Sequence, residues 1–259
     1  MPFEDRVDAG RRLAKALGSY RERRPIVLGL PRGGVPVAAE VARSLDAPLD
    51  ALIVRKLGAP GNPELGFGAV AENQVRTVDP DMCDALGIGS RDVDRIAAEQ
   101  EAEVRHRVSL LRAGQPMVDV RGRTVIIVDD GLATGSTAAA AVQAAREFGS
   151  SRVIVAVPVG SRQAFQRLQR LADEVVCLEV PADFRAVGDH YVDFAQVDDQ
   201  TVRNLLLDRA VQEISVPIPT AAGPVLRLPG TLSVPAHAQG LVIFAHGSGS
   251  SRLSPRNQK

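Results

Sequence analysis

The stretch VIIVDDGLATGST, residues 125–137, decides the fold of this chain. It opens with the apolar run Val125 to Val128, which is typical of a strand buried on both faces. Two carboxylates, Asp129 and Asp130, follow directly, and a hydroxyl-rich segment then leads into an alanine-rich helix expected at 138–148. A strand that passes through a glycine turn into a helix is one unit of a parallel α/β sheet.

Similar units lie on both sides of this stretch. Apolar runs predict strands at 26–30, 49–54, 153–157 and 174–178, and helical periodicity predicts helices at 5–19, 35–45, 163–171 and after Asp198. We also expect a hairpin at 69–78 and a long charged helix at 90–112. The glycine- and proline-rich segment 58–68 is expected to be a mobile loop. The fold class is therefore α/β with a parallel, doubly wound sheet.

The amino-acid composition of the sequence changes after Ala210. Residues 211–240 are rich in Pro, Gly and Ala, with short β-like pieces at 214–218 and 225–228. An apolar strand is expected at 241–245, directly before His246 and Gly247. We therefore expect a domain at 1–210 and a short, β-rich C-terminal segment at 211–259.

Charge and composition exclude several classes of protein. Lys+Arg and Asp+Glu are both 31, so the basic excess that nucleic-acid binding usually requires is missing and no nucleic-acid partner is expected. No apolar run reaches the length of a membrane span, and the N-terminus has no signal-peptide core. Cys83 and Cys177 have no metal-ligand spacing and are expected to be reduced thiols. We expect a cytoplasmic protein without a membrane partner, and a homodimer.

The loop after the acid pair has the chemistry of a phosphate site. Gly135 allows close approach of the backbone, and the following helix offers amide groups and a favourable dipole to an anion. The residues expected to bind a 5′-phosphate are Ala133, Thr134, Gly135, Ser136 and Thr137. Asp129 and Asp130 would accept hydrogen bonds from the hydroxyls of a ribose. The simpler alternative is an ordinary capped turn, and the Gly-Lys-Ser/Thr ending of a Walker loop is missing.

With these residues in place, the segment resembles the phosphoribosyl pyrophosphate (PRPP) motif of type I phosphoribosyltransferases. The resemblance extends over most of residues 1–210. It implies a parallel sheet with a small hood, PRPP as the donor, and an enzyme that transfers its phosphoribosyl group. It also implies Mg2+, bound mainly through PRPP and in part through Asp129 and Asp130.

Two further segments resemble the pyrophosphate side of that family's site. Arg32, Gly33 and Gly34 follow a strand and would bind pyrophosphate, although a tight turn is the alternative. Arg55 and Lys56 end the next strand and would clamp the same group, unless they are simply solvated. The segment 58–68 corresponds to the family's flexible catalytic loop. The expected catalytic residues are therefore Arg32, Arg55, Lys56, Asp129 and Asp130.

The run 181–191 concentrates aromatic residues in a chain that is only 3% aromatic. It is similar to the hood of hypoxanthine-guanine phosphoribosyltransferases, which implies stacking of a base on Phe184 and contacts from Val187, Gly188 and Asp189. Ordinary core aromatics are the alternative. Ala133 replaces the acidic base of the 6-oxopurine enzymes, and no lysine follows the strand at 153–157. The acceptor is therefore left open as a nucleobase or another nitrogen nucleophile.

Two other interpretations remain open. The scaffold could serve as a non-catalytic regulator that binds PRPP or a nucleotide. The segment 241–251 resembles the start of a dienelactone hydrolase-like α/β-hydrolase, which implies an incomplete domain at 211–259. Its apolar strand is expected to pack on the first domain or to pair with a neighbouring chain. The Gly-x-Ser-x-Gly nucleophile elbow is absent from this chain, so we expect no hydrolase activity.

Overall fold

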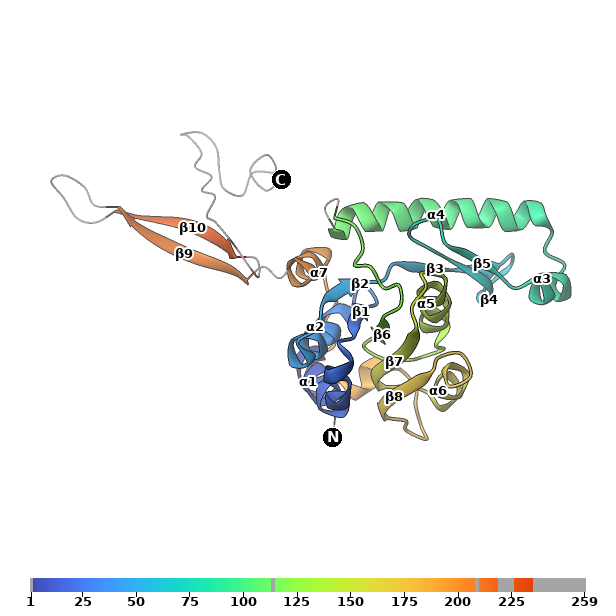
Figure 1. The fold of residues 1–259 in the computed structure, drawn as a ribbon, viewed down its shortest axis with the longest axis horizontal. Coiled ribbons are helices and arrows are strands. Elements are labelled where there is room, and N and C mark those ends of the chain that lie inside the picture. Colours follow the sequence, from blue (N-terminus) through green and yellow to red (C-terminus); the bar gives the residue numbers. More distant parts are fainter. Residues whose placement is uncertain (1, 113–114, 208–209, 219–225, 235–259) are drawn as a thin grey trace. The chain divides into compact units, whose positions relative to one another are not determined.

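The computed structural model, drawn in Figure 1, describes residues 2–112, 115–207, 210–218 and 226–234. The chain forms two compact units, Met1–Leu206 and Leu207–Lys259, and each is described by itself. The first unit contains the segment that decides the fold.

A five-stranded sheet forms the centre of the first unit, and all of its neighbouring strands are parallel. The strand order is β2-β1-β6-β7-β8. Between β1 and β6 the order reverses, and in doubly wound sheets ligands bind at the carboxyl ends of the strands at such a point. The predicted fold class is confirmed. The strands are β1 (Ile26–Gly29), β2 (Leu49–Ala51), β6 (Thr124–Val128), β7 (Arg152–Val159) and β8 (Glu174–Glu179).

Helices cover both faces of this sheet (Figure 1). On one face, α1 (Arg6–Ala16) and α2 (Gly34–Leu45) pack with Val27, Ile126 and Ile154. On the other face, α5 (Ser136–Glu147) packs with the alternate strand residues, which include Ile127 and Val155, and α6 (Arg162–Leu168) adds to the same core. Because successive strand residues point to opposite faces, an unbroken apolar strand supplies both cores.

A second, antiparallel sheet consists of β3 (Val54–Ala59), β4 (Asn62–Ala71) and β5 (Arg76–Val78). The prediction that 58–68 is a loop was wrong, because β3 and β4 continue to a tight turn at Pro60–Gly61. Gly68 is needed inside the strand, since a Cβ there would lie 2.3 Å from the carbonyl oxygen of Thr77. Glycine therefore marks close strand pairing here and not a lack of structure.

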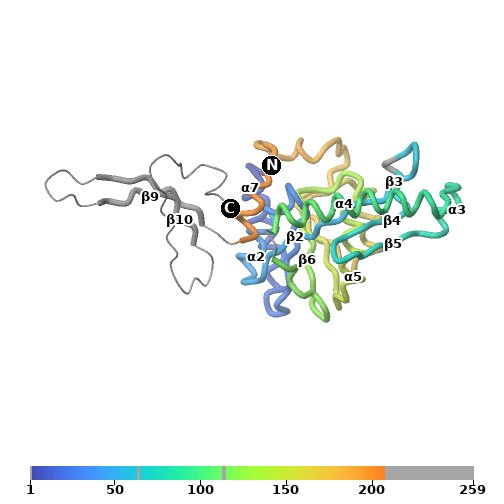
Figure 2. The backbone as a smooth tube through the Cα atoms, turned by 90° about the horizontal axis from the view of Figure 1, so that it is seen from above, coloured from blue at the N-terminus to red at the C-terminus, as the bar shows by residue number. Residues whose placement is uncertain are grey.

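Helices α3 (Pro80–Leu86) and α4 (Ser90–Arg112) follow the second sheet. Figure 2 shows α4 running along β3, β4 and β5. The apolar side of α4 buries Val93, Ala97 and Val104 in the same core as Phe67. Its charged side is satisfied within the helix, for example by Arg107 with Glu103 at 3.0 Å.

The other predicted elements of this unit have close counterparts. The hairpin at 69–78 is confirmed by the pairing of β4 with β5. The strand expected at 49–54 is divided, because β2 ends at Ala51 in the central sheet and β3 begins at Val54 in the second one. The last helix is α7 (Asp199–Leu206), and Asp198 accepts a hydrogen bond from the Thr201 amide at 2.7 Å. Short 3-10 helices at Gly18–Arg23 and Val187–His190 complete the unit.

A buried ion cluster connects the two sheets to the end of α4. Arg112 donates from Nε to Asp50 at 2.9 Å and from Nη2 to Glu72 at 2.9 Å. It also donates to the carbonyl oxygen of Ala51. Asp50 accepts further hydrogen bonds from the amides of Ala51 at 2.7 Å and Val118 at 2.9 Å. We call Asp50, Glu72 and Arg112 the buried triad; every charge in it is matched by a partner.

The second unit contains an antiparallel pair of strands, β9 (Ala210–Ile218) and β10 (Leu226–Val234). The β-like pieces expected at 214–218 and 225–228 fall largely within these strands. The strand expected at 241–245 and the rest of the hydrolase-like segment lie outside the described residues, so that resemblance stays a prediction. Over the described part of the chain, no helix has both the length and the apolar character to cross a membrane.

Candidate functional site

Asp129 and Asp130 stand directly after β6, at the point where the strand order reverses. The loop after β1 lies against them. A Cβ on Gly33 would be 1.9 Å from Oδ2 of Asp130, and a Cβ on Gly34 would be 2.8 Å from Cα of Asp129. Only glycine fits at such distances, so the two loops form one continuous surface around the acid pair. The Pro31–Arg32 peptide bond in this surface is cis.

Arg6, on the first turn of α1, is a site residue that the sequence did not indicate. Its Nε donates to Oδ2 of Asp130 at 2.8 Å, and its Nη1 donates to the carbonyl oxygen of Ala195 at 2.8 Å. The guanidinium also lies 4.0 Å from the ring centroid of Phe194. Arg6 therefore links the N-terminal helix, the acid pair and the segment after the hood.

The acid pair is held in an environment that disfavours its charge. Burial raises the pKa of Asp129 well above its ordinary value, and the neighbouring charge of Asp130 raises it further. Burial also raises the pKa of Asp130, while the hydrogen bond and the charge of Arg6 oppose this shift. Carboxylates placed in this way favour ligands that bring hydroxyl donors or positive charge to them.

Residues 133–137, which we call the phosphate loop after the role predicted for them, lead from β6 into α5 and present polar groups around Gly135. Gly135 has φ +72, a left-handed conformation that suits glycine, and α5 begins at the next residue. Thr134 Oγ1 lies 3.1 Å from Ser136 Oγ and accepts from the Ser136 amide at 3.3 Å. Ala133, Thr134 and Thr137 are exposed. The expected phosphate-binding residues are therefore gathered at the N-terminus of a helix, which is a favourable place for an anion.

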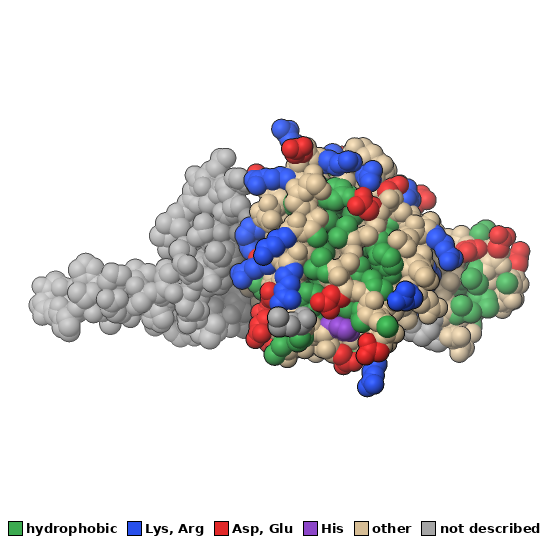
Figure 3. Space-filling view, turned by 90° about the horizontal axis from the view of Figure 1, so that it is seen from below, with side chains coloured by type: hydrophobic (Ala, Val, Ile, Leu, Met, Phe, Trp, Pro, Cys, Tyr) green, Lys and Arg blue, Asp and Glu red, His purple; other side chains and the backbone are tan. Residues whose placement is uncertain are grey.

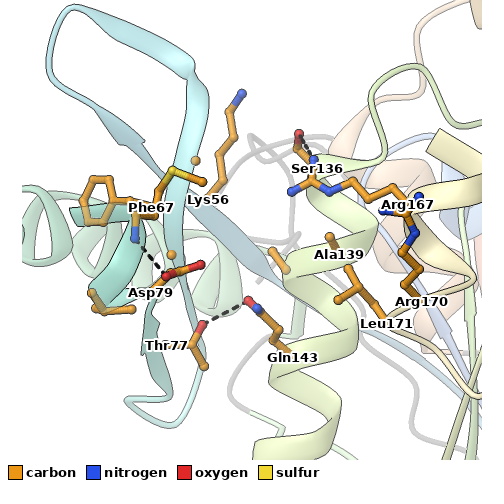
Figure 4. Close-up of a pocket in the computed structure, with 15 residues that line it drawn as sticks. Lys56, Phe67, Thr77, Asp79, Ser136, Ala139, Gln143, Arg167, Arg170 and Leu171 are labelled. Atoms are coloured by element: carbon orange, nitrogen blue, oxygen red, sulfur yellow. Dashed lines mark hydrogen bonds between the residues drawn. The ribbon is translucent and has the colours of Figure 1, made fainter. Parts of the chain in front are cut away.

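Two predicted cations on β3 face different ways. Arg55 pairs with Glu103 on α4, with Nη2 2.8 Å from Oε1. Lys56, the next residue, lines a cavity beside Ser136 of the phosphate loop, as Figure 4 shows. Adjacent strand residues point to opposite faces, so one strand cannot aim both side chains at the same ligand. The geometry brings Lys56 toward the loop and leaves Arg55 on the side of α4.

Arg32 lies on the loop after β1, close to the start of α7. Hydrogen bonding from Thr201 lowers the pKa of Asp198, and the positive charge of Arg32 lowers it further. The Arg32 side chain is half-buried. The next residue, Gly33, lies against Asp130 of the acid pair. Its pyrophosphate role stays a prediction.

The hood residues pack on the acid pair from the other side. Phe184 stacks on His190 with ring centroids 5.7 Å apart, and Tyr191 donates from its hydroxyl to the carbonyl oxygen of Asp130 at 2.6 Å. Val187 packs so closely on Gly131 that a Cβ there would lie 2.5 Å from Cγ1. Gly188 contacts Phe194, and Asp189 is exposed. The hood is thus in place, while the stacking role of Phe184 toward a base stays a prediction.

The described residues offer few ligands to a resident metal ion. They contain no group of three or more His, Cys, Asp and Glu side chains able to hold one. The acid pair supplies two carboxylates, and one of them is already paired with Arg6. Mg2+ is often held by one or two carboxylates together with substrate phosphates, and the acid pair fits this pattern.

The surface on the side away from α4 carries both signs of charge. Figure 3 shows Lys and Arg as well as Asp and Glu side chains around a central area rich in hydrophobic side chains, with a histidine at its edge. Mixed charge on this face agrees with the zero formal net charge of the chain.

Known proteins resemble this chain over most of its length. The model of the phosphoribosyl transferase domain matches residues 4–195. "Putative phosphoribosyl transferase Rv0571c" of Mycobacterium tuberculosis H37Rv, and a protein of the same description in strain CDC 1551, are 46% identical to it over 270 residues. These alignments cover 99% of this chain, which itself spans 61% of the length of these curated relatives.

Among solved structures, TT1426 from Thermus thermophilus matches with a TM-score of 0.75 and 46% identity. The match covers 80% of this chain and 99% of the Thermus protein. The domain match begins just before Arg6, ends at Ala195 and encloses the acid pair, both loops and the hood. This chain therefore belongs to the phosphoribosyl transferase domain family.

Proposed function

We propose that the first unit transfers the phosphoribosyl group of PRPP to a nitrogen nucleophile, with release of pyrophosphate. The observation that carries this proposal is the contact between Gly33 and Asp130, at which a Cβ would be only 1.9 Å from Oδ2. This contact places a loop that is suited to bind pyrophosphate beside carboxylates that are suited to bind ribose. The bond that breaks in PRPP lies between these two groups.

In this proposal the ribose and its 5′-phosphate bind to the segment after β6. Asp129 and Asp130 accept hydrogen bonds from the ribose hydroxyls. Thr134, Ser136 and Thr137 donate from their hydroxyls to the 5′-phosphate, together with the first amides of α5. Burial raises the pKa values of both carboxylates in the free protein. Hydrogen bonds donated by the ribose hydroxyls would stabilise their charged forms.

The leaving pyrophosphate binds to the amides of Arg32 and Gly33 and to the guanidinium of Arg32, whereas the Gly34 amide donates to the carbonyl oxygen of Leu30 at 3.0 Å. Lys56 approaches from the second sheet and offsets negative charge that grows as the C1′–O bond breaks. The chemistry that Mg2+ supplies when bound is neutralisation of pyrophosphate charge, and Asp129 and Asp130 are the residues that would hold it. Catalysis rests on positioning and electrostatics, with no covalent intermediate on the protein.

The hairpin of β3 and β4 is suited to exclude water from the reacting centre. It carries Lys56 on one strand, and the register of the two strands shifts between Leu57, Gly58 and Ala59, next to the turn. Water would otherwise trap the oxocarbenium-like carbon, which makes a closing hairpin useful. The acceptor approaches from the hood side, past Val187 and Phe184. Ala133 cannot act as a base there, so removal of a proton from the acceptor would fall to another group.

Calorimetric titration of the full chain with PRPP and Mg2+ tests the donor site. We expect binding that weakens at least about 100-fold in Asp129→Asn/Asp130→Asn, since two charge-assisted hydrogen-bonding groups are lost. The matched control is Asp119→Asn, because Asp119 is exposed and its ion pair is with Arg121. Absence of binding, or equal binding in the acid-pair variant, rejects the donor site.

Release of pyrophosphate with a panel of nucleobases and other nitrogen nucleophiles then tests catalysis. A signal above the acceptor-free rate, lost in Lys56→Met, supports transfer. PRPP binding without release for any member of the panel would instead favour the regulator, which binds the donor and does not use it.

A further inference from the structure

A groove lies along α5, next to Ser136 of the phosphate loop. Its floor is the face of α5 that carries Ser136, Ala139, Ala140 and Gln143, and its volume is about 500 Å³. Figure 4 shows the second sheet as one wall and the region of α6 as the other. A hydrogen bond of 3.3 Å between Thr77 Oγ1 and Gln143 Oε1 joins the floor to the first wall. The volume is within the range of small-molecule sites.

Positive charge is concentrated at this groove. Arg167 and Arg170 extend from the α6 wall, and Lys56 extends from the opposite wall (Figure 4). Neither Arg167 nor Arg170 forms an ion pair with a carboxylate of the described part of the chain. The acid that lines the groove is Asp79, and its Oδ1 already accepts from the Met82 amide at 3.0 Å. An anionic ligand therefore gains more attraction than repulsion there.

The groove is continuous with the phosphate loop. Arg167 donates from Nη1 to Ser136 Oγ at 3.4 Å, and Ser136 begins α5. One end of the groove is thus suited to a phosphate, because it combines a guanidinium, a hydroxyl and the start of a helix. Arg170 lies farther along the same wall, where it could contact a second phosphate.

The remainder of the lining is apolar. The apolar side chains that line it are Val78, Met82, Ala139, Ala140 and Leu171, whereas the Phe67 ring is buried in the core beside α4. Alanine on the floor leaves a flat surface between the two walls. A ligand for this groove should therefore combine a flat apolar body with a phosphate group. Nucleotides have this combination of a base and a charged end.

We propose that this groove is a second binding site, distinct from the acid pair, and that it takes a nucleoside diphosphate. The two phosphates would lie along Arg167 and Arg170, and the base would lie over α5 between Val78 and Leu171 of the two walls. Ser136 belongs to the groove and to the phosphate loop, where its hydroxyl contacts Thr134. A ligand in the groove would therefore change the hydrogen bonds of the loop. The groove thus provides a route by which a nucleotide regulates the neighbouring site.

Calorimetric titration with ADP in EDTA tests this site in the Asp129→Asn/Asp130→Asn protein, which lacks the ribose-binding acids. We expect ADP to bind with Kd below about 1 mM, and Arg170→Glu to weaken it at least about tenfold. Arg162→Glu is the matched control, because Arg162 is exposed on α6, which directly precedes the turn that carries Arg170, and does not line the groove. It should change the Kd less than about twofold, at unchanged Tm of both variants.

Three results would overturn the proposal. They are no binding of ADP at concentrations up to about 1 mM, equal losses in Arg170→Glu and Arg162→Glu, or equal affinity for inorganic pyrophosphate, which would indicate a simple polyanion site. The outcome is separable from that of the donor site. If ADP binds through Arg170 while PRPP does not bind to the unmodified chain, the groove stands and the proposed transfer fails.

Discussion

Two regions of this protein each combine two carboxylates with one arginine, yet they have opposite characters. In the buried triad, the side chains of Asp50, Glu72 and Arg112 are 8%, 5% and 4% exposed. At the acid pair, Arg6 and Asp130 are 12% and 16% exposed, and glycine backbone replaces side chains around them. The first cluster is closed by protein on every side, and the second is open toward two loops.

The hydrogen-bond partners explain this difference. Asp50 accepts from two backbone amides as well as from Arg112, so its carboxylate has little capacity left. Asp129 accepts only from the Asp130 amide among the contacts of the described residues. A carboxylate with unused acceptor capacity beside a loop is poised for a ligand, whereas a saturated one serves the fold. Charge composition alone would not separate the two clusters.

The largest expected effect is on the buried triad. Arg112→Met leaves Asp50 and Glu72 buried without their counter-ion, and the free energy of unfolding should fall by about 3–5 kcal/mol. Urea denaturation measures this change. Arg121→Met, which breaks an exposed pair with Asp119, should leave the urea midpoint almost unchanged. If Arg112→Met cost less than about 1 kcal/mol, the triad would not stabilise the fold as we describe.

Removal of a second charge should restore part of that loss. Glu72→Leu/Arg112→Met leaves no uncompensated carboxylate at position 72, so it should be more stable than Arg112→Met alone by roughly 1–2 kcal/mol. Equal or lower stability of the double variant would show that Glu72 does not depend on Arg112.

A smaller effect is expected where the two loops touch at the acid pair. Gly33→Ala places a methyl group on Oδ2 of Asp130, so the loop must shift at a cost of about 1–3 kcal/mol in the free energy of unfolding, and PRPP affinity should fall by roughly 10- to 100-fold. Calorimetry measures the affinity. Gly18→Ala is the control, because nothing lies within 4 Å of a Cβ there. Unchanged affinity in Gly33→Ala would separate the first loop from the donor site.

The role of Arg6 can be tested by loss of its charge. Arg6→Gln keeps a donor near Asp130 and removes the positive charge, so PRPP should bind about tenfold more weakly, through misplacement of the carboxylate. Arg12→Gln, on the same helix, removes an exposed pair with Asp8 and should have little effect. Rescue of affinity by Arg6→Lys would indicate that charge matters more than the shape of the guanidinium.

The smallest effect concerns the stability of the unliganded protein. The pKa of Asp129 is raised in the folded state, so the folded protein holds the proton of this carboxyl more tightly than the unfolded chain does. The stability that this proton contributes is present at low pH and is lost as pH rises through the folded pKa. Asp129→Asn avoids this loss and should raise the Tm at pH 7 by about 2–4 °C, as ~1 kcal/mol does in a domain of this size. Thermal unfolding in EDTA from pH 4 to pH 8 should show the gain increasing with pH. A pH-independent difference would contradict this cause.

The sequence predicted the central sheet well, because its strands are unbroken apolar runs that end in turns. The stretch 125–137 also indicated the acid pair and the phosphate loop, since both lie within one local strand-turn-helix unit. The hairpin of β3 and β4 was missed because its glycines, such as Gly68, are needed for contacts with a distant strand. Composition cannot distinguish that use of glycine from a loop.

The parts of the site that escaped prediction depend on long-range contacts. Arg6 meets Asp130 across 124 positions of sequence, and no local pattern marks it within a helix that also carries Arg11 and Arg12. Arg55 and Lys56 look like one clamp in the sequence, although strand alternation separates them in the structure. The buried triad joins three elements, and each of its residues looks like an ordinary surface charge in the sequence.

The order β2-β1-β6 has a consequence for how the protein could be divided. A chain opened at the turn Pro60–Gly61 would leave β1 and the first loop on one fragment, and β6 with the acid pair on the other. Neither fragment would hold a complete site, because the contact of Gly33 with Asp130 is made only when β1 inserts beside β6. The two pieces would then act as complementing halves, with donor binding as the readout of their reassembly.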